Sequence, residues 1–471
     1  MEPTPETADD AAEATSRKSR DYGKTAGFLT IGVGLTGLFT YVYFFIAAHD
    51  LSKDSYGEIT VLWSAVFITV STLYRPVDQL LSRHISEHLE RGEPDTAPVK
   101  VAAKIQVLLA IGFAIVALIF REPLESGLLA GNDALYWVFF SSVLFYAASY
   151  YARGYLAGHQ QFGLFTGLIL SESVFRTLFA VLVAVGLLSG QTMVAIGIVA
   201  APLLSLMVVP SAIRRRTRRE AEQRKEDGIA ESEEEESISE FSLTSGAGFV
   251  GSLFLIMFAE QVFLNAGPLV VRSIEGVAAA GFIFNVLMIA RAPLQLFQAV
   301  STSILPHLTS LHSSTDPDSE RQFHDSVRTV LLGILGFTAV AALVVAIAGP
   351  QLMQLAFSDK FTYPVQDLLL VTAGMGLYLA AVTVNQASLA QGQARRASIR
   401  WILCAIFFVI WMFLPFISDG NVRVEIGFTL TALILFTTVF WIYRRPHGVA
   451  ADIPSEGSSE EIETRLAGLD D

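Results

Sequence analysis

The sequence predicts an all-α, polytopic membrane protein with twelve transmembrane helices in two six-helix lobes. Its composition is strongly apolar: of 471 residues, 52% are hydrophobic and 16% are charged, against roughly 25% charged residues in soluble domains. Apolar stretches of the ~20 residues that cross a bilayer recur along the chain. The two halves also share short sequence patterns in the same order, which indicates an internal duplication.

Twelve apolar stretches lie between clusters of charged and turn-forming residues, and each is predicted to be one transmembrane helix. The first, from about Thr25 to His49, is too long for a signal-peptide core, so we expect it to be retained. The outer loops are short, and the longest is expected from about Gly349 to Pro364. The predicted spans are 25–49, 58–80, 100–120, 134–157, 162–188, 191–212, 242–266, 277–311, 327–348, 365–390, 398–417 and 423–443.

The distribution of Lys and Arg predicts the orientation, because these residues are enriched in cytoplasmic loops. With both termini inside, 24 of the 32 bases fall on the cytoplasmic side, Arg153 among them, and five fall in outer loops. The remaining three, Arg75, Arg176 and Arg291, lie within helices. This distribution predicts a multi-pass protein of the cell membrane, with the N- and C-termini in the cytoplasm.

Charge divides the chain into five parts: an acidic N-terminal tail (1–24), the N-lobe (25–212), a charged linker (213–241), the C-lobe (242–443) and an acidic C-terminal tail (444–471). Acidic runs of this kind are usually solvated surface rather than metal sites. Together with a net charge of −13, they are typical of proteins in a salt-adapted cytoplasm, such as that of halophilic archaea. Of the 45 acids, 22 lie in Met1 to Ala14, Arg214 to Glu240 and Pro446 to Asp471.

Three pairs of motifs carry the duplication. Their spacings are 214, 216 and 233 residues, so both lobes start on the same side and form parallel repeats related by a pseudo-twofold axis along the membrane normal. The first pair has a G-x-G-x-x-G pattern, but it lies inside apolar helices, where small residues favour close helix packing rather than dinucleotide binding. The pairs are "GVGLTG" from Gly32 with "GAGFVG" from Gly246, "RPVDQLL" from Arg75 with "RAPLQLF" from Arg291, and "LAGHQ" from Leu156 with "LAQGQ" from Leu389.

An enzymatic function finds no support in the motifs. The sequence contains no HExxH motif, nucleophile elbow, P-loop or cluster of His and Cys residues. Its single cysteine, Cys404, lies in an apolar stretch and excludes a disulfide within the chain. We therefore expect a protein that is not an enzyme, with no metal, no cofactor and no nucleic-acid partner.

Ionisable residues within the helices are the candidate functional residues, because a charge in hydrocarbon is costly and usually faces a bundle interior or a water-filled cavity. Arg75 and Arg291 lie at matching positions in the inner halves of the two lobes. Alternatively, their side chains extend to the inner headgroups. Glu172 and Arg176 are four residues apart and therefore share one helix face, where they either form a structural pair or contribute to a site.

Further polar residues and prolines complete the candidate site. The candidates for binding a coupling cation or proton are Asp78, Glu172 and Glu260. The amides expected to line a path for cargo are Asn265, Asn285, Gln295 and Gln298. Three prolines either kink their helices or let them bend between two states: Pro76, Pro293 and Pro306.

The segment "FAEQVFLNAGPLVVRSIEGVAAAGFIFNVLMIARAPLQLFQAVSTSILPHLTSL" resembles the seventh and eighth helices of the polysaccharide-transport flippases in the multidrug/oligosaccharidyl-lipid/polysaccharide exporter superfamily. Glu260 stands at the acidic position that opens this region in the family. Gly281-Phe282 resembles the start of the eighth helix, and Pro306 to Ser310 resembles its end. The stretch "SYGEITVLW" from Ser55 resembles the entry to the second helix. The twelve-helix layout and the duplication match the family as well.

The resemblance implies that the protein flips lipid-linked oligosaccharides from the cytoplasmic to the outer leaflet. The cargo would hang from a polyprenyl or dolichyl (pyro)phosphate and feed the assembly of surface polysaccharide or glycoprotein. The partners it implies are this cargo, membrane lipids, a coupling cation or proton, and glycosyltransferases of the same pathway. We expect the two lobes to alternate access to a central cavity, in which Arg75, Arg176 and Arg291 contribute to substrate binding and the first and last of these hold the lipid phosphate.

Two other functions stay open at this point. One is a multidrug or cation antiporter of the same superfamily, although cationic drugs favour a cavity with net negative charge and the charges counted within the helices are balanced. The other is a membrane scaffold that transports nothing and recruits partners through the charged linker and tails.

Overall fold

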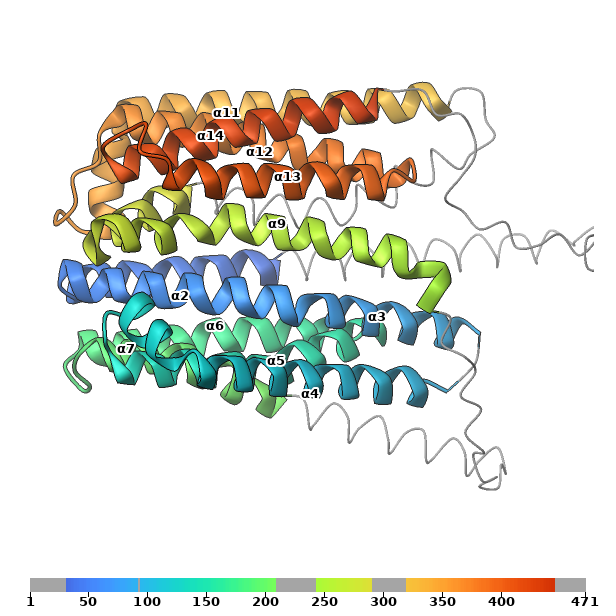
Figure 1. Ribbon diagram of the computed structural model, residues 1–471, viewed down its shortest axis with the longest axis horizontal. Helices are drawn as coiled ribbons and strands as arrows, with labels where there is room; N and C mark the ends of the chain where they lie inside the picture. The colour runs from blue at the N-terminus through green and yellow to red at the C-terminus, as the bar shows by residue number, and fades with distance from the viewer. Residues whose placement is uncertain (1–30, 92–93, 209–242, 290–318, 445–471) are drawn as a thin grey trace, which may run out of the picture.

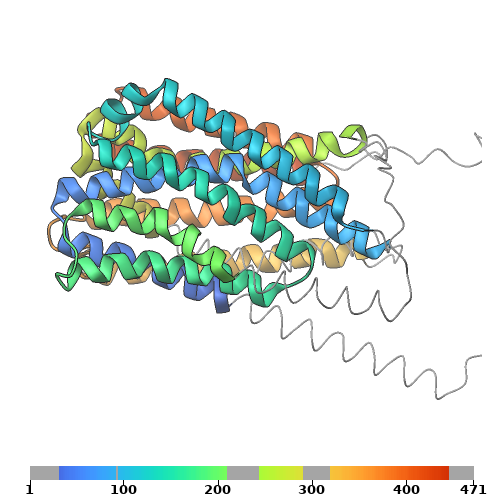
Figure 2. The same ribbon diagram turned by 90° about the horizontal axis from the view of Figure 1, so that it is seen from below.

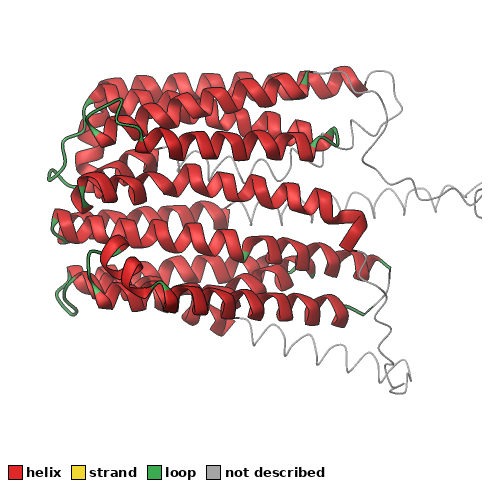
Figure 3. Cartoon of the chain, in the orientation of Figure 1, coloured by secondary structure: helices red, strands yellow, loops and turns green. Residues whose placement is uncertain are grey.

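The computed structural model describes residues 31–91, 94–208, 243–289 and 319–444, and every regular element among them is a helix (Figure 3). The N-lobe and the C-lobe lie side by side, with α2 of one lobe next to α9 of the other between them (Figure 1). The N-lobe consists of helix Ile31–Asp50, α2 (Lys53–Leu73), α3 (Arg75–Glu90), α4 (Thr96–Ile119), the short π-helix η1 (Pro123–Leu128), α5 (Asp133–Gly158), α6 (Phe162–Ala184), α7 (Gln191–Ser205) and the 3₁₀ turn η2 (Leu206–Val208). The C-lobe consists of α9 (Leu243–Glu275), helix Val277–Ile289, α11 (Ser319–Phe357), α12 (Val365–Ala390), α13 (Ala394–Phe413) and α14 (Gly420–Tyr443).

Each of the twelve predicted spans overlaps a described helix, counting α2 and α3 as one span, and residues 290–311 of the eighth span lie outside the described part of the chain. Among the described residues, nine helices are long and apolar enough to cross a membrane, and helices Gln191–Ser205 and Val277–Ile289 are shorter. The predicted all-α, polytopic fold is therefore confirmed. In Figure 2, seen from below, the N-lobe helices cover the near face of the bundle.

Two predicted spans end too early, each just before a Gly-Pro pair. Helix α9 continues through Pro268 to Glu275, and α11 continues through Pro350 to Phe357. Membrane helices tolerate interior prolines because neighbouring groups can satisfy the freed backbone. The outer loop expected from Gly349 is therefore only the segment 358–364.

The second span is longer than predicted and is interrupted at Tyr74. Helix α2 ends at Leu73, and α3 begins at Arg75 and continues to Glu90 rather than ending near residue 80. Pro76 lies in the first turn of α3, where its missing N–H costs no helical hydrogen bond. The break is observed at the proline expected to act as a hinge, while movement about Pro76 stays a prediction.

The contacts between helices repeat in the two lobes. Helix α4 packs on α5, α5 on α7 and α6 on α7 in the N-lobe, as α11 packs on α12, α12 on α14 and α13 on α14 in the C-lobe. Helix Ile31–Asp50 contacts α6, since the Thr177 hydroxyl donates to the Phe39 carbonyl at 2.9 Å. The corresponding helices of the C-lobe, α9 and α13, are neighbours too. Four equivalent pairs thus support the duplication.

The ends of α5 and α12 repeat in atomic detail. Gln160 and Gly392, each two residues past the last helical residue, have left-handed φ values of 55° and 74°. The next amides, of Gln161 and Gln393, donate to the carbonyls five residues earlier, at 2.8 and 2.9 Å. This is a common hydrogen-bonding pattern for ending a helix. It aligns the lobes with an offset of 232 residues here, so the offset of 233 read from the sequence motifs was wrong by one residue.

Glycines bring neighbouring helices into backbone contact. A Cβ added at Gly154 would lie 2.7 Å from the Asp78 carbonyl oxygen, and one at Gly158 would lie 2.9 Å from the Ser82 carbonyl oxygen. Helices α5 and α3 therefore cross along a small-xxx-small face. Gly32, in the first glycine motif, would meet a methyl group of the neighbouring α6 in the same way, which agrees with a packing role for that motif.

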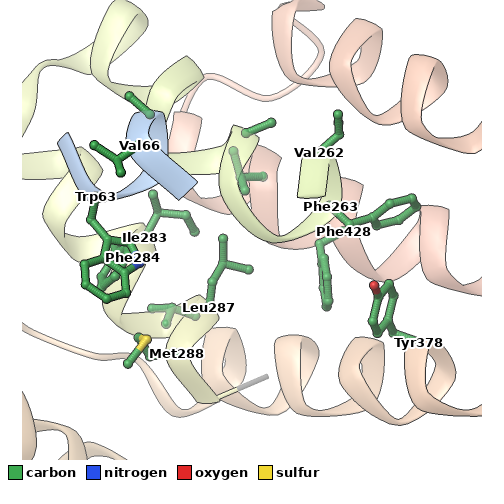
Figure 4. Packing of buried hydrophobic residues seen from close by; sticks show 14 of the residues in the cluster. Trp63, Val66, Val262, Phe263, Ile283, Phe284, Leu287, Met288, Tyr378 and Phe428 are labelled. Atoms are coloured by element: carbon green, nitrogen blue, oxygen red, sulfur yellow. The ribbon is translucent and has the colours of Figure 1, made fainter. Parts of the chain in front are cut away.

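Buried apolar side chains continue across the lobe boundary. Trp63 and Val66 of α2 lie near Phe284 of helix Val277–Ile289 in the same cluster (Figure 4). Phe44 joins them, with its ring centroid 4.9 Å from that of Trp63 and 4.6 Å from that of Phe284. The two lobes therefore share an apolar core in this conformation.

Candidate functional site at the lobe interface

An ion pair links the two lobes within the bundle. Arg75, the first residue of α3, directs Nη1 to Oε2 of Glu260 on α9, at 3.4 Å. The side chains are 29% and 13% exposed, so the pair is mostly but not fully buried. At 1.5 Å per residue, Arg75 lies ~33 Å along the helical span that begins at Lys53.

This pair is one end of a row of alternating charges that continues into the N-lobe. Asp78, one turn after Arg75 on α3, interacts electrostatically with both Arg75 and Arg153 of α5. Arg153 in turn donates to Glu172 of α6 at 2.5 Å, and Arg176 donates to the other oxygen of Glu172 at 3.0 Å. We call these six groups the charged row: Glu260, Arg75, Asp78, Arg153, Glu172 and Arg176.

The end of the charged row formed by Glu172 and Arg176 is buried and hydrogen-bonded. The Glu172 carboxylate also accepts hydrogen bonds from Tyr146 at 2.7 Å and Ser149 at 3.3 Å. The guanidinium of Arg176 lies over the Trp63 ring, 4.6 Å from its centroid. Four donors therefore surround Glu172, and this geometry favours the structural pairing that the sequence left open for Glu172 and Arg176.

Arg153 is not the cytoplasmic loop residue that the sequence predicts. Its side chain is 15% exposed, and its guanidinium lies 4.4 Å from the Tyr150 ring centroid. Arg153 lies five residues before the end of α5, near enough to the end to be mistaken for a loop residue. Moving it to the interior leaves 23 cytoplasmic bases against five outer ones, so the predicted orientation is unchanged.

A pocket of about 330 Å³ opens beside the charged row. It lies between α3, α5 and α6, and the polar groups come from α3 while the apolar ones come from α5 and α6. Arg83, at its edge, is held by Glu87 through a 2.7 Å ion pair. The lining residues are Asp78, Gln79, Ser82, Arg83, Ser86, Ala157 and Phe165.

The two described amides from the candidate site are buried. Asn285 accepts a hydrogen bond from Tyr56 of the N-lobe and donates one to Tyr363 at 2.9 Å. Asn265 donates to the Gln261 side chain at 3.1 Å. Their exposed fractions are 0% and 4%, so the expectation that they line an open path does not hold in this conformation.

The outer ends of the lobes are joined by a set of contacts that we call the outer seam: the hydrogen bonds of Asn285, the crossing of Gly57 with Gly281, and Lys360. The Gly57 and Gly281 backbones meet so closely that a Cβ on Gly281 would lie 3.2 Å from the Gly57 Cα. The Lys360 ammonium of the C-lobe donates to three carbonyls at the end of helix Ile31–Asp50 and just after it. These belong to Ala48, His49 and Leu51, at 3.2, 2.8 and 2.7 Å.

Five candidate residues lie outside the described part of the chain and keep their sequence-based roles as expectations: Arg291, Pro293, Gln295, Gln298 and Pro306. The structure also contains a residue that the sequence analysis did not single out. Glu425, in α14, is 0% exposed, and neither of its carboxylate oxygens has a hydrogen-bond partner. Glu425 could have been identified from the sequence, because it is an acidic residue two residues inside the predicted start of the last span.

No family model and no curated protein matches the chain. Solved structures do. A point mutant of the Vibrio cholerae MATE transporter VcmN is 18% identical over 92% of this chain and 97% of that chain, with a TM-score of 0.59. The inward-facing conformation of a multidrug resistance MATE family transporter of the MOP superfamily is 10% identical over 88% and 96%, with a TM-score of 0.63. An outward-facing structure described in the same words is 12% identical over 89% and 95%, with a TM-score of 0.59.

At these identities the likeness establishes the fold. It is a fold of multi-pass membrane transporters, in agreement with the predicted membrane location. The chain therefore has the all-helical fold of the MATE transporters of the MOP superfamily.

Proposed function

We propose that the protein is a flippase that moves an oligosaccharide linked to a polyprenyl or dolichyl (pyro)phosphate across the cell membrane by alternating access. The observation that carries this proposal is the charged row at the lobe interface. It places three guanidinium groups against three carboxylates, one of which, Glu260, belongs to the C-lobe. An anionic lipid phosphate that replaced Glu260 on Arg75 would keep this balance of charge, whereas a cationic drug would not.

Arg75 is the residue best placed to bind the phosphate. Its side chain is 29% exposed, whereas that of Arg176 is 3% exposed. Its contact with Glu260, at 3.4 Å, is longer than the roughly 2.7–2.9 Å of a strong charged hydrogen bond. A phosphate group could therefore replace Glu260 with two parallel hydrogen bonds. Arg291, at the matching position of the repeat, is the second candidate.

The pocket beside the charged row suits the sugar part of the cargo. Its polar side chains, from Asp78 to Ser86, include a carboxylate, an amide and two hydroxyls, which together donate and accept the hydrogen bonds that sugar hydroxyls make. Phe165 adds an apolar surface at the edge. The acyl chain would stay in the bilayer, and the outer seam would keep the outer side closed while cargo enters from the cytoplasm.

The transport cycle would join the cytoplasmic supply of cargo to assembly outside. Glycosyltransferases of the same pathway would provide the lipid-linked glycan, and a cation or proton would drive the exchange. Glu260, Asp78 and Glu172 are the coupling candidates proposed from the sequence. Of these, Glu260 lies in the ion pair between the lobes, so binding of a cation or proton there would also weaken the contact between α3 and α9.

Export of the glycan in a strain without the chromosomal gene tests this proposal. Arg75→Ala should reduce export at least tenfold at equal protein level, and Arg75→Lys should be a weaker lesion because it keeps the charge but loses bidentate binding. Arg121→Ala is the matched control, since Arg121 is an exposed outer arginine paired with Glu125 and Asp133. Normal export by Arg75→Ala would contradict the phosphate-binding role.

A multidrug or cation antiporter is the second candidate function. The observation that favours it is the likeness to solved structures described as multidrug resistance MATE family transporters. Deletion of the gene distinguishes the two functions. Increased sensitivity to cationic drugs with normal surface glycans would favour the antiporter, and a glycan defect with unchanged drug sensitivity would favour the flippase.

The scaffold hypothesis rests on the linker 213–241 and the two tails, which lie outside the described residues. Removing these parts separates the hypotheses. Glycan export that persists without them would count against a scaffold, because the transmembrane lobes alone would then account for the function.

A further inference from the structure

Glu425 is an isolated carboxyl group in the interior of the C-lobe. It lies in the second turn of α14, and it is 0% exposed. Among the described residues it is the one Asp or Glu with both carboxylate oxygens buried and without a hydrogen-bond partner. An ionised carboxylate in such a place is very costly unless it is paired or hydrogen-bonded. The mechanism proposed above leaves this group without a role.

The charged groups on the packed elements do not neutralise Glu425. Helices α9, α12 and α13 pack on α14. Arg423 of α14 directs its guanidinium to the carbonyls of Met412 and Ile417, and Arg272 of α9 donates to the N-lobe at Ser126. The basic residues of α13 lie in its first two turns, at the opposite end from Glu425: Arg395, Arg396 and Arg400.

The other groups near Glu425 are acids. Asp367, in the first turn of α12, and Asp419, the N-cap of α14, both act on it electrostatically. Glu275, at the end of α9, accepts a hydrogen bond from the amide of Gly420, the first residue of α14. A carboxylate whose electrostatic partners are other carboxylates is stabilised by binding a cation.

A proton suits this place better than a metal ion. The described residues contain no group of three or more His, Cys, Asp or Glu side chains that could hold a metal, and sodium or calcium would need several oxygen ligands. A proton needs one carboxylate and makes it neutral. The exposure of the three acids also decreases in order, since Asp419 is exposed, Asp367 is half-buried and Glu425 is buried. Glu425 lies six residues, ~9 Å, along α14 from Asp419.

We propose that Glu425 is a proton-binding site of the C-lobe, loaded from the outer side through Asp419 and Asp367. In the transfer, the O–H bond of protonated Asp367 breaks as the O–H bond of Glu425 forms, and the anionic Asp367 then takes the proton of Asp419, which is protonated again from outer water. The buried state described here is the protonated one. Its use as the coupling site rests on the proposed transport function, whereas proton binding itself does not.

Infrared difference spectra of the purified protein in liposomes, recorded while the pH is changed, test proton binding without any cargo. The wild-type protein should show the carbonyl band of a buried carboxylic acid, and Glu425→Gln, which keeps the shape but cannot ionise, should lose it. Asp133→Asn, at an exposed acid of the N-lobe, should keep the band. An unchanged band in folded Glu425→Gln protein would overturn the proposal. If that variant does not fold, Glu425→Asp takes its place, and an unshifted band would overturn the proposal equally.

Export assays on the same variants test the coupling separately. Loss of both the band and export in Glu425→Gln supports the coupling role. Loss of the band with normal export refutes the coupling role and leaves the flippase intact. A wild-type protein that shows the band but exports no glycan refutes the proposed function and leaves the proton site standing.

Discussion

Arg75 Nη1 lies 3.4 Å from Glu260 Oε2, and this contact joins the first turn of α3 in the N-lobe to α9 in the C-lobe. The same arginine is the most exposed of the three guanidinium groups in the charged row, which continues to Arg176. Arg75 can therefore serve two purposes, holding the lobes together and binding an anionic group. These purposes make different demands on charge, which allows them to be separated.

The double variant Arg75→Glu with Glu260→Arg separates them. The swap preserves an ion pair between the lobes but moves the guanidinium to α9. We expect the thermal stability of the purified protein to stay close to wild type, because the swapped pair still places one cation against one carboxylate. Glycan export should nevertheless fall at least tenfold. Recovery of export together with the ion pair would show that Arg75 holds the lobes and does not bind phosphate.

Glu172 should be essential for stability rather than for transport alone. Glu172→Ala leaves Arg153 and Arg176 as two buried guanidinium groups without a carboxylate between them. Removing one partner of a buried ion pair typically costs about 3–5 kcal/mol. We expect a clear decrease in the melting temperature of the detergent-purified protein, or failure to accumulate in the membrane.

Glu125→Ala provides the comparison for Glu172. Glu125 pairs with Arg121 at the outer surface, where the Arg121 side chain is 46% exposed, so its removal should cost at most about 1 kcal/mol. Equal melting temperatures for Glu172→Ala and Glu125→Ala would show that the buried network contributes no more than a surface pair.

Helix positions could be predicted from the sequence because hydropathy and the Lys/Arg bias depend on the bilayer and not on tertiary detail. The twelve spans were predicted from hydropathy, whereas the duplication was indicated by three pairs of sequence motifs. The helix ends were less predictable. Helices α9 and α11 continue through Pro268 and Pro350, residues at which a helix of a soluble protein would usually end. The one-residue error in the repeat offset arose because gaps between short motifs cannot be placed without backbone hydrogen bonds.

The site was predictable only in part. The ionisable residues were found because charge is rare in membrane helices, but their partners depend on how the helices pack. The sequence indicated the pair of Glu172 and Arg176, four residues apart, and could not indicate that Arg75 meets Glu260, 185 residues away. It also could not show that Asn285 is enclosed by two tyrosines. Most contacts in this site join segments that are far apart in the sequence.

The crossing of α5 and α3 predicts an unequal response to two glycine substitutions. Gly154→Ala places a Cβ 2.7 Å from the Asp78 carbonyl oxygen, so α3 must shift, and overpacking of this kind costs about 1–3 kcal/mol. Gly163→Ala, in α6, meets nothing within 4 Å and should be neutral or slightly stabilising. Melting temperatures of the two variants measure the difference. A Gly154→Ala protein as stable as Gly163→Ala would mean that the helices are less closely packed than described.

Lys360 should stabilise the state in which the outer side is closed. Its ammonium donates to three carbonyls at the end of helix Ile31–Asp50 and just after it, and carbonyls in the last turn of a helix have no partner within that helix. Lys360→Ala removes these bonds between the lobes, so we expect the outer ends of the lobes to separate more often. Spin labels at Asp54→Cys and Gln366→Cys, both exposed positions, measure this distance after replacement of the single native Cys404.

The distance distribution between these labels should gain a longer component in Lys360→Ala, while Arg121→Ala should leave it unchanged because Arg121 pairs within the N-lobe. Lys360→Arg should stay near wild type, since it keeps a cation at the carbonyls. If the outer distance is the same with and without Lys360, the outer seam is held by other contacts. The hydrogen bonds of Asn285 with Tyr56 and Tyr363 would then be the part of the seam that must break before the outer side can open.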